Sequence, residues 1–462
     1  MRKSNRLITW LLLACMVLSF SACSQGQAPE TTQAPAVETT APATDVNATE
    51  SAVLEAVDYA GQVQLDMASG TAKQEVTVKQ FIDGDTTHFH VPSYVMPSGV
   101  LKARYLAVNT PESTGKIEEY GKKAASFTKE KLSSAVSIII ESDGAAWEAD
   151  STGDRYLSWI WYKPADADSY RNLNIELLQE GLAIASNSAQ NRYGETCMAA
   201  LNQAKAMKLN VFSGQKDPDF YYGEAVELTL KELRANIESY SGMKVAFNGI
   251  VTMNDNSSIY VEEYDAETDM YYGMSVYYGF NLTGKGLEII KVGNEVRIVG
   301  SVQYYEAGGT WQVSDLNYRQ MKPKDPNNIQ MLSEGHDPAY RLTDAETFLN
   351  GTVVVESEDG SVTAPYAQLA MSSSIEMKGL KVVDIYTTTN AESSSKGAMT
   401  LTCEVDGMRI SVRTTVLLDK DGNLVTEKAY AGKTIDVKGI IDYYDGTYQI
   451  KVFSADNITV TN

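Results

Sequence analysis

The alternation of apolar and polar residues predicts that β-strands make up most of this chain. Between residues 57 and 215, apolar residues recur at helical spacing in three segments, which are Tyr120 to Ser133, Leu173 to Ala185 and Glu195 to Leu209. Most of the remaining residues in this part alternate with a period of two, as strands do, and Val57 to Met67 is among them. The pattern therefore predicts a mainly β fold with helices packed against it, of the α+β class.

The second half of the chain contains two segments that resemble each other. They run from Val292 to Tyr318 and from Ala431 to Ile458. Each begins with an alternating strand that contains a glycine, continues through a Tyr-Tyr pair and a hairpin turn with glycine, and ends in another alternating strand. A glycine inside a strand lets the strand bend at the corner of a barrel. This order is similar to that of the closing strands of oligonucleotide-binding (OB) folds.

Strands that would open the same two barrels precede these segments, at Val245 to Met253 and Leu380 to Tyr386. We therefore predict two OB-like β-barrels after residue 220. The chain is predicted to begin with a signal peptide (1–22) and a tether (23–51), followed by a first folded domain (57–215). The first OB-like barrel (221–325), a linker (326–339) and the second OB-like barrel (340–460) come after it. Three prolines between Pro323 and Pro338 indicate the linker.

The first residues are typical of a secretory signal. Basic residues precede an apolar run, from Leu7 to Phe20, that is too short and wrongly flanked for a membrane-spanning helix. Small residues lead to Cys23, as at a bacterial lipoprotein cleavage site, so we predict that Cys23 becomes the lipid-modified first residue of the mature chain. Ordinary cleavage beside an unmodified Cys23 is the alternative. The tether is rich in Pro, Thr, Ala and Glu and lacks side chains for a core. The expected location is the extracellular face of the bacterial cell membrane.

The cysteine content excludes a disulfide-stabilised protein, and the net charge opposes binding of a polyanion. Of the four cysteines, Cys15 leaves with the signal peptide, Cys23 carries the lipid, and Cys197 and Cys403 fall in different predicted domains. They cannot form a disulfide framework or a metal-ligand cluster. Stability must therefore come from apolar cores, which 462 residues with 43% hydrophobic content can supply. The net charge of -21 opposes binding of a polyanion unless divalent cations intervene.

Candidate catalytic residues are concentrated between Phe81 and Ser113. Asp85 follows a glycine turn, Arg104 lies on a predicted strand, and Asn109 and Glu112 flank a Thr-Pro pair beyond that strand. These residue types suit phosphodiester hydrolysis. Oxygen ligands hold a hard cation, a carboxylate positions or deprotonates water, and arginine neutralises the phosphate.

Several motifs in a fixed order resemble the staphylococcal nuclease (thermonuclease) family. They are IDGDT at Ile82–Thr86, the arginine strand with its loop at Arg104–Glu112, YGxxAxxFTK at Tyr120–Lys129, GDRYLSWIWY around Arg155, NxxLLQEGLA at Asn174–Ala183 and LNVFS at Leu209–Ser213. The resemblance covers Val76 to Ser213. It implies a small five-stranded OB-type barrel with packed helices.

The resemblance also implies an activity and a site. Members of the family are calcium-dependent nucleases, so Ca2+ is the implied cofactor and DNA or RNA the implied substrate. The implied metal ligands are Asp85, Asn109 and the carbonyl of Thr110. The implied catalytic residues are Glu112, which handles water, and Arg104 and Arg155, which contact the phosphate.

The chain departs from the family pattern at several positions. Asn109 stands where the family usually has aspartate, which either weakens calcium binding or marks a dead site. The family's lysine and tyrosine before the second arginine are Thr152 and Gly153 here, and its tyrosines after the GLA helix are replaced near Asn187 to Ala189. Substrate binding should therefore differ from that of the family. The choices between DNA and RNA and between endonuclease and exonuclease stay open.

Two further groups of residues have a functional and a structural interpretation. Six aromatic residues of the later barrels are candidates for stacking on single-stranded nucleic acid: Tyr304, Tyr305, Trp311, Tyr443, Tyr444 and Tyr448. The alternative, favoured by the acidic charge, is that they only fill strands of small barrels. His88 and His90 share a strand face but lack a third ligand, so we interpret them as a solvated face rather than a metal site.

Two functions from different classes are open. The first is a lipid-anchored, calcium-dependent extracellular nuclease. The second is a catalytically degenerate surface adaptor that binds nucleic acid or cell-envelope material through its barrels. Retention of the acids and both arginines favours the enzyme, because a scaffold has no need for two guanidiniums beside carboxylates. The predicted partners are the nucleic-acid substrate and the membrane, and no protein partner is predicted.

Overall fold

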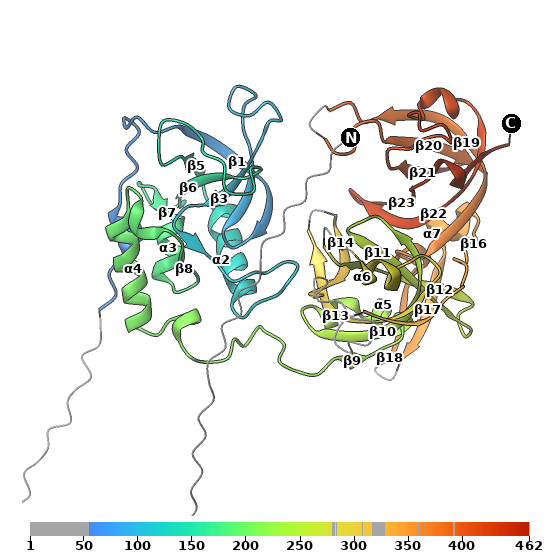
Figure 1. The fold of residues 1–462 in the computed structure, drawn as a ribbon, viewed down its shortest axis with the longest axis horizontal. Coiled ribbons are helices and arrows are strands. Elements are labelled where there is room, and N and C mark those ends of the chain that lie inside the picture. The colour runs from blue at the N-terminus through green and yellow to red at the C-terminus, as the bar shows by residue number, and fades with distance from the viewer. Residues whose placement is uncertain are drawn as a thin grey trace, which may run out of the picture. The chain divides into compact units, whose positions relative to one another are not determined.

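Three five-stranded barrels with the same strand order make up the described part of the chain (Figure 1). The computed structural model describes residues 55–461 except 280, 281, 283, 307, 317–328, 358, 359, 391 and 392. In each barrel the third strand pairs in parallel with the fifth, and the fourth returns to the first. This closed order is that of an OB fold. The predicted fold class is confirmed.

The first barrel, in blue and teal in Figure 1, forms around two buried tryptophans. Its strands are β1 (Lys73–Asp83), β2 (Thr86–His90), β3 (Val100–Tyr105), β5 (Ser137–Glu141) and β6 (Tyr156–Lys163). Trp159 and Trp161 on β6 are fully buried. The shorter strands beside the barrel are β4 (Val108–Asn109), β7 (Arg171–Asn172) and β8 (Ile184–Ala185). Strands β4 and β8 pair with each other, which ties the loop after β3 to the helical part.

Three helices cover this barrel, as the apolar spacing predicted. They are α2 (Gly121–Ser133), α3 (Leu173–Gln179) and α4 (Gly194–Ala206). Helix α3 ends at Gln179 rather than at the predicted Ala185. The chain turns at Gly181, which has a φ of 65°, and the N–H of Leu182 donates to the carbonyl of Leu177 (2.9 Å). The residues beyond this turn form β8 instead.

The prediction of a strand from Val57 to Met67 is wrong. This segment contains a short helix, α1 (Tyr59–Gln62), whose first turn is capped by the side chain of Asp58. Arg171 holds the same carboxylate through two hydrogen bonds, of 2.7 and 2.8 Å. Local alternation predicted a strand, but this cap and its tertiary ion pair favour a helical turn.

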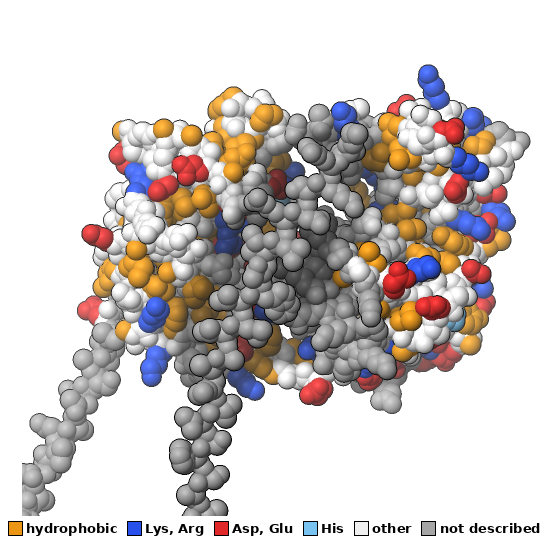
Figure 2. All heavy atoms as spheres, viewed as in Figure 1, with side chains coloured by type: hydrophobic (Ala, Val, Ile, Leu, Met, Phe, Trp, Pro, Cys, Tyr) orange, Lys and Arg blue, Asp and Glu red, His pale blue; other side chains and the backbone are white. Residues whose placement is uncertain are grey.

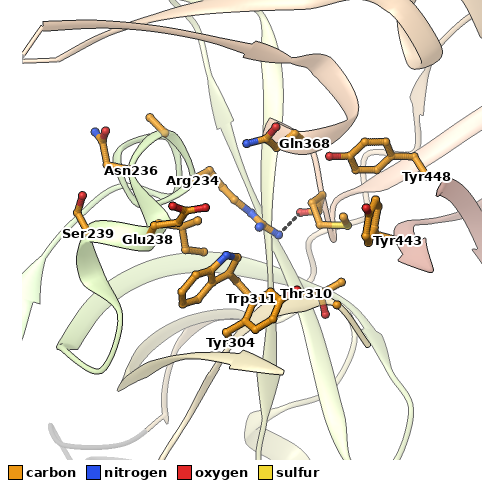
Figure 3. A pocket seen from close by; sticks show the side chains of 14 residues that line it. Arg234, Asn236, Glu238, Ser239, Tyr304, Thr310, Trp311, Gln368, Tyr443 and Tyr448 are labelled. Atoms are coloured by element: carbon orange, nitrogen blue, oxygen red, sulfur yellow. Dashed lines mark hydrogen bonds between the residues drawn. The ribbon is translucent and has the colours of Figure 1, made fainter. Parts of the chain in front are cut away.

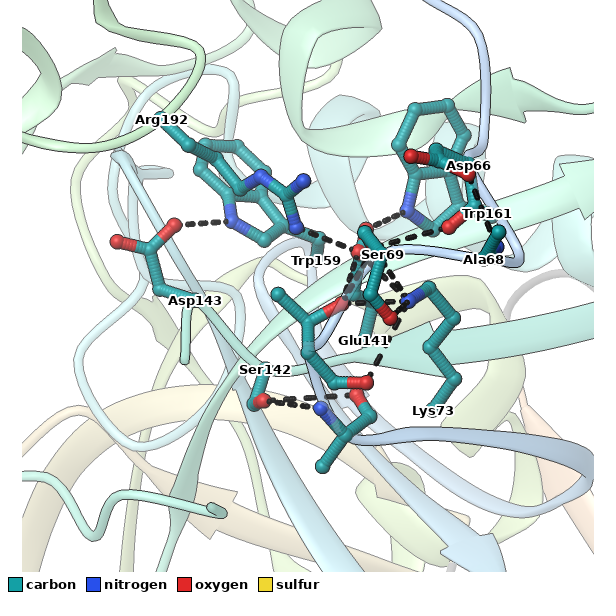
Figure 4. Close-up of polar contacts among 12 residues, drawn as sticks. Asp66, Ala68, Ser69, Lys73, Glu141, Ser142, Asp143, Trp159, Trp161 and Arg192 are labelled. Carbon is teal, nitrogen blue, oxygen red and sulfur yellow. Dashed lines mark hydrogen bonds and ion pairs between the residues drawn. The ribbon is translucent and has the colours of Figure 1, made fainter. Parts of the chain in front are cut away.

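A buried carboxylate ties the start of β1 to the barrel and to the loop before α4 (Figure 4). Glu141, at the end of β5, is fully buried. It accepts hydrogen bonds from Thr71 (2.6 Å), Trp161 (2.8 Å) and Arg192 (2.6 Å). The ammonium of Lys73 lies 3.6 Å away. The charge of Glu141 is therefore balanced by two basic groups from different parts of the domain.

The two later barrels confirm the predicted opening and closing strands. The second consists of β10 (Lys244–Asn254), β11 (Ser258–Asp265), β12 (Met270–Tyr277), β13 (Glu295–Tyr305) and β14 (Thr310–Ser314). The third consists of β19 (Ser374–Thr387), β20 (Met399–Val405), β21 (Met408–Thr414), β22 (Thr434–Tyr444) and β23 (Thr447–Val452). Around them lie α5 (Leu230–Ala235), α6 (Lys285–Ile289), α7 (Ala345–Asn350), α8 (Tyr366–Leu369), the hairpin of β17 (Thr352–Ser357) and β18 (Gly360–Pro365), and the short strands β9 (Val226–Glu227), β16 (Arg341–Leu342) and β24 (Ile458–Val460).

The segment predicted as a linker contains a strand. Residues Ile329–Ser333 form β15, which pairs antiparallel with β13. Part of the predicted linker at 326–339 therefore belongs to the sheet of the second barrel. The prolines that indicated the linker flank the strand in sequence, and Pro323 and Pro326 lie outside the described residues.

One continuous hydrophobic core runs through the second and third barrels. Glu262 on β11 is buried and accepts hydrogen bonds from the N–H groups of Ala339 and Ser374 (both 2.8 Å). Gly273 on β12 allows a close approach, because a Cβ atom there would lie 2.2 Å from the backbone nitrogen of Ser373. The two barrels thus pack closely against each other. No helix among the described residues is long and apolar enough to cross a membrane.

Candidate active site

The turn between β1 and β2 presents two aspartates. Asp83 and Asp85 are buried, with 8% and 1% of their surface exposed, and the N–H of Asp85 donates to Oδ1 of Asp83 (3.1 Å). Gly84 between them has no room for a side chain, because a Cβ atom would lie 2.9 Å from the side chain of Thr110. The hydroxyl of Thr128, on α2, donates to the carbonyl of Gly84 (2.7 Å). Helix α2 and the loop after β3 therefore fix the turn.

Arg104, on β3, joins Asp85 to Asn109. Its Nη1 forms an ion pair with Oδ1 of Asp85, and its Nη2 donates to Oδ1 of Asn109 (2.6 Å). The other oxygen of Asp85 accepts the N–H of Thr110 (2.8 Å). These charge-assisted hydrogen bonds hold the guanidinium in one orientation. The structure thus brings Asp85, Asn109 and the backbone N–H of Thr110 together with the first predicted arginine.

Arg155, the second predicted arginine, lies where β6 closes the barrel. Arg104 is aligned with Leu157 in the parallel pair β3–β6, and Arg155 directly precedes β6. Its Nε donates to Oδ2 of Asp150 (2.8 Å), and its Nη2 forms an ion pair with the same oxygen (2.7 Å). The side chain of Arg155 keeps 32% of its surface exposed. It is therefore oriented by an acid and still accessible to a ligand.

Glu112 lies in the loop after the cluster, and hydrogen bonds of its backbone fix its position. Its N–H donates to the carboxylate of Glu118 (3.3 Å), and its carbonyl accepts the N–H of Glu118 (2.9 Å). A Cβ atom on Gly121 would lie 2.1 Å from the same carbonyl, so glycine is required there. Partial desolvation of the carboxyl raises the pKa of Glu112, and the charge of Asp83 raises it further.

The charged groups of the cluster influence one another. Burial raises the pKa of the Asp83 carboxyl, and the charge of Arg104 opposes this rise. Burial likewise lowers the pKa of the Arg104 guanidinium, which Asp83 opposes. The positive charge of Arg155 likewise opposes the rise in the pKa of Asp83 and of Glu112. Two acids and two arginines therefore share one electrostatic environment, as is frequent at catalytic sites.

Two residues of the site were not predicted. Asp83 lies two residues before Asp85, and the spacing of acids on both sides of a glycine could have suggested that both face the same site. Asp150, which orients Arg155, has no motif of its own. Its role depends on a fold that brings residues 150 and 155 together, and the local sequence carries no sign of it.

A family model described as staphylococcal nuclease homologue matches residues 102–214. The chain carries a staphylococcal nuclease domain. The match begins after the turn of Asp83 and Asp85, although β1 and β2 complete the same barrel. No curated protein matches the chain. Members of the family are nucleases, so the domain indicates a nuclease-type function.

The oxygen atoms of the candidate site suit the hard cation that the staphylococcal nuclease family generally uses. They come from the carboxylates of Asp83 and Asp85 and from the amide of Asn109. Among the described residues, no three His, Cys, Asp or Glu side chains are grouped so as to hold a metal, so carbonyl oxygens would have to complete a calcium site. The guanidinium of Arg104 contacts Asp85 and Asn109 directly. A cation bound to those two oxygens would therefore require Arg104 to move away from them.

The other predicted residues lie in different surroundings. A pocket in the later barrels brings together four of the six aromatic candidates: Tyr304, Trp311, Tyr443 and Tyr448. Tyr305 and Tyr444 are exposed (48% and 64%) and do not line it. The predicted signal peptide and tether, with Cys23, lie outside the described residues.

The two histidines predicted to form a solvated face differ in exposure. His90 is exposed, whereas His88 is half-buried on β2. Burial, together with the positive charges of Lys102 and Lys79, lowers the pKa of His88 to about 4. His88 is therefore neutral at pH 7, and the interpretation as a solvated face holds for His90 only.

Proposed function

We propose that this protein is a lipid-anchored, calcium-dependent extracellular nuclease that hydrolyses phosphodiester bonds of DNA or RNA. The observation that carries the proposal is the cluster in which Arg104 joins Asp85 to Asn109, with Arg155 directly before the neighbouring strand β6. The nuclease family of residues 102–214 supports the reaction type. Two oriented guanidiniums beside carboxylates suit a phosphodiester better than an uncharged ligand.

The proposed roles follow from these contacts. Arg104 and Arg155 bind the phosphate, and Asp150 keeps Arg155 in its orientation. Glu112 takes a proton from water, for which a raised pKa brings it closer to neutral pH. Calcium held by Asp85, Asn109 and the Thr110 carbonyl would supply further neutralisation of the phosphate. The phosphate itself attracts Arg104, which allows the guanidinium to leave Asp85.

The direct test is incubation of the soluble protein with single-stranded and double-stranded DNA and RNA, each with calcium or with a chelator. We expect cleavage of at least one substrate with calcium and none with the chelator. Loss of the calcium-dependent cleavage in Arg104→Ala would assign it to this site. If no substrate is cut under any condition, the surface-adaptor alternative is favoured.

Replacing Asn109 with aspartate is expected to lower the calcium concentration that gives half-maximal cleavage. The added negative charge also strengthens the contact with Arg104. A divalent ion nevertheless gains about twice as much as a monovalent guanidinium from the same charge at the same distance. The rate at saturating calcium should stay within about tenfold, because Glu112 and both arginines are unchanged.

Calcium titrations of both forms on one substrate measure this effect. Asn109→Ala serves as the matched control, since it removes the oxygen and should raise the calcium requirement. If the titrations of wild type and Asn109→Asp superimpose, position 109 does not contact the metal. If only the aspartate variant is active, the wild-type site is dead.

The charge distribution favours contact with a short stretch of nucleic acid. On the face shown in Figure 2, basic and acidic side chains are interspersed over the described surface, without a continuous basic stripe. The whole chain carries a net charge of -21. Long-range attraction of a polyanion is therefore weak, and binding depends on local groups such as Arg104 and Arg155.

The proposed anchor predicts a change of location. Cys23→Ser should move the protein from the membrane fraction into the medium, because the serine cannot carry the lipid and no described helix could span a membrane. Fractionation of cells that express each form, with detection by antibody, measures the change. Persistence of Cys23→Ser in the membrane fraction would contradict lipid attachment at this residue.

A further inference from the structure

A pocket of about 400 Å³ lies where the second and third barrels meet (Figure 3). Tyr304 on β13 and Trp311 on β14 come from the second barrel, and Tyr443 on β22 and Tyr448 on β23 come from the third. These strands belong to the two segments that resemble each other in sequence. The packing of the barrels thus brings the corresponding aromatic residues of both segments to one place.

The aromatic rings form two pairs that lie next to each other. The ring centroids of Tyr304 and Trp311 are 5.2 Å apart, and those of Tyr443 and Tyr448 are 5.0 Å apart. A Cβ atom on Gly309 would lie 3.6 Å from Cε1 of Tyr443. The hairpin turn of the second barrel therefore lies close to a ring of the third. The result is an apolar wall with contributions from both barrels, of the kind on which a flat ring can stack.

A buried arginine projects into this pocket. Arg234, on α5, has only 6% of its surface exposed. Its Nε donates to the carbonyl of Gly273 (2.6 Å), and its Nη2 donates to the carbonyl of Met371 (2.8 Å). Figure 3 shows the guanidinium between Trp311 and Gln368. Neutral carbonyls from both barrels hold it in place.

Among the residues that the structure describes, no acidic side chain balances the charge of Arg234. No carboxylate there lies within ion-pair distance of it, and its hydrogen bonds come from Nε and Nη2, not from Nη1. Burial without an opposite charge lowers the pKa of Arg234 to about 10. The arginine nevertheless stays charged at pH 7. A buried cation with a free donor, beside aromatic rings, is a site for an anionic group attached to a flat ring.

Polar groups on the rim add hydrogen-bonding capacity. Asn236, Ser239, Thr310 and Gln368 line the pocket and offer both donors and acceptors. Glu238 lines it as well and can accept hydrogen bonds from hydroxyl or amino groups. Such groups match the edge of a nucleobase or the hydroxyls of a sugar.

We propose that this pocket binds one nucleotide unit, with the base against the aromatic rings and the phosphate on Arg234. The proposal rests on the proposed nuclease function, which would release such units. Residues 221–462 contain 34 Asp and Glu against 20 Lys and Arg, so a long strand is repelled while a single nucleotide meets a local cation. The unit can be a free nucleoside monophosphate or the phosphorylated end of a strand.

Binding to the full chain in the presence of a chelator, which stops calcium-dependent cleavage, tests the proposal. A nucleoside monophosphate, the matching nucleoside, inorganic phosphate and a neutral disaccharide are titrated by calorimetry. We expect the monophosphate to bind at least tenfold more tightly than the nucleoside or phosphate alone, and the disaccharide not to bind. An oligonucleotide with a 5′-phosphate, compared with the monophosphate, distinguishes a strand end from a free nucleotide.

Variants locate the binding. Trp311→Leu should weaken monophosphate binding by about tenfold or more, because stacking on a base is lost. Tyr444→Leu removes an exposed aromatic residue next to the pocket and should leave the affinity within about twofold. Arg234→Lys keeps the charge but loses the planar fork, and we expect it to weaken binding of the monophosphate more than that of the nucleoside. A melting curve accompanies each variant, and Trp311→Leu decides the result if Arg234→Lys is unfolded.

The outcomes separate this site from the nuclease site. Arg104→Ala should lose cleavage and keep monophosphate binding. If the wild type cuts no substrate but binds the monophosphate in a way that depends on Trp311, the proposed activity fails and the pocket assignment stands. Absence of monophosphate binding, equal affinity of wild type and Trp311→Leu, or binding of the disaccharide alone would overturn the assignment.

Discussion

Replacement of Arg104 with alanine should lower kcat/KM for phosphodiester cleavage by about 10²- to 10³-fold, the cost of one lost charge-stabilising donor in an active site. Arg104 is mostly buried and contacts Asp85 and Asn109, and its charge opposes the rise in the pKa of Asp83. The variant therefore loses a phosphate ligand. The variant also leaves the buried carboxylates of Asp83 and Asp85 without the positive charge of Arg104. Their negative charges would then repel the phosphate.

Lys102 provides the matched control for this prediction. It lies two residues before Arg104 on β3, but 40% of its side chain is exposed, and it pairs with the exposed Asp154. Lys102→Ala should leave kcat/KM within about threefold, because an exposed charge is screened by solvent. Initial rates with a fluorescent oligonucleotide measure both variants. Equal activity of Arg104→Ala and wild type would show that cleavage does not use this site.

Replacement of Glu141 with alanine should destabilise the nuclease domain by about 3–5 kcal/mol, the usual cost of removing one partner of a buried ion pair. Glu141 is fully buried and balances Arg192 and Lys73. It also accepts hydrogen bonds from Thr71 and Trp161. The variant leaves two cations and the indole N–H of Trp161 without their acceptor in the same region.

Urea unfolding, followed by tryptophan fluorescence, measures the loss of stability. Trp159 and Trp161 report on the nuclease domain. Both the Glu141→Ala variant and the reference protein should carry Trp311→Phe. The later barrels then do not contribute to the tryptophan fluorescence. Asp154→Ala is the control, because its ion pair with Lys102 is exposed and should contribute about 1 kcal/mol or less. Similar midpoints for both variants would contradict the proposed role of Glu141.

Much of the fold could be predicted because it depends on local patterns. The predicted opening strands, Val245 to Met253 and Leu380 to Tyr386, lie within β10 and β19. Alternation of side chains determines which face of a strand is buried, and a glycine permits the bend that closes a small barrel. Helix α2 was likewise predicted, because its apolar spacing is local. Val57 to Met67 was predicted wrongly, because the contact between Asp58 and Arg171 spans distant parts of the chain.

Most residues of the candidate site could also be predicted from the sequence, because they occur in short motifs. Asp85 lies in a tight turn, and Asn109 and Glu112 follow the strand of Arg104 within a few residues. A resemblance between motifs could therefore identify them together. Asp150 had no such signal, because it acts only through the hydrogen bond and ion pair that it forms with Arg155.

The sequence by itself determined the two later barrels, because strand periodicity and glycine turns depend on neighbouring residues. The first barrel and the residues of its site followed from the resemblance of short motifs to those of a known family. The tertiary structure alone decided which charges are compensated. It placed Glu141 among basic groups, held Arg104 on Asp85 and Asn109, and buried Arg234 between carbonyls of two barrels. Burial and charge balance depend on segments far apart in the chain, such as Arg234 and Met371, and no local pattern specifies which segments meet.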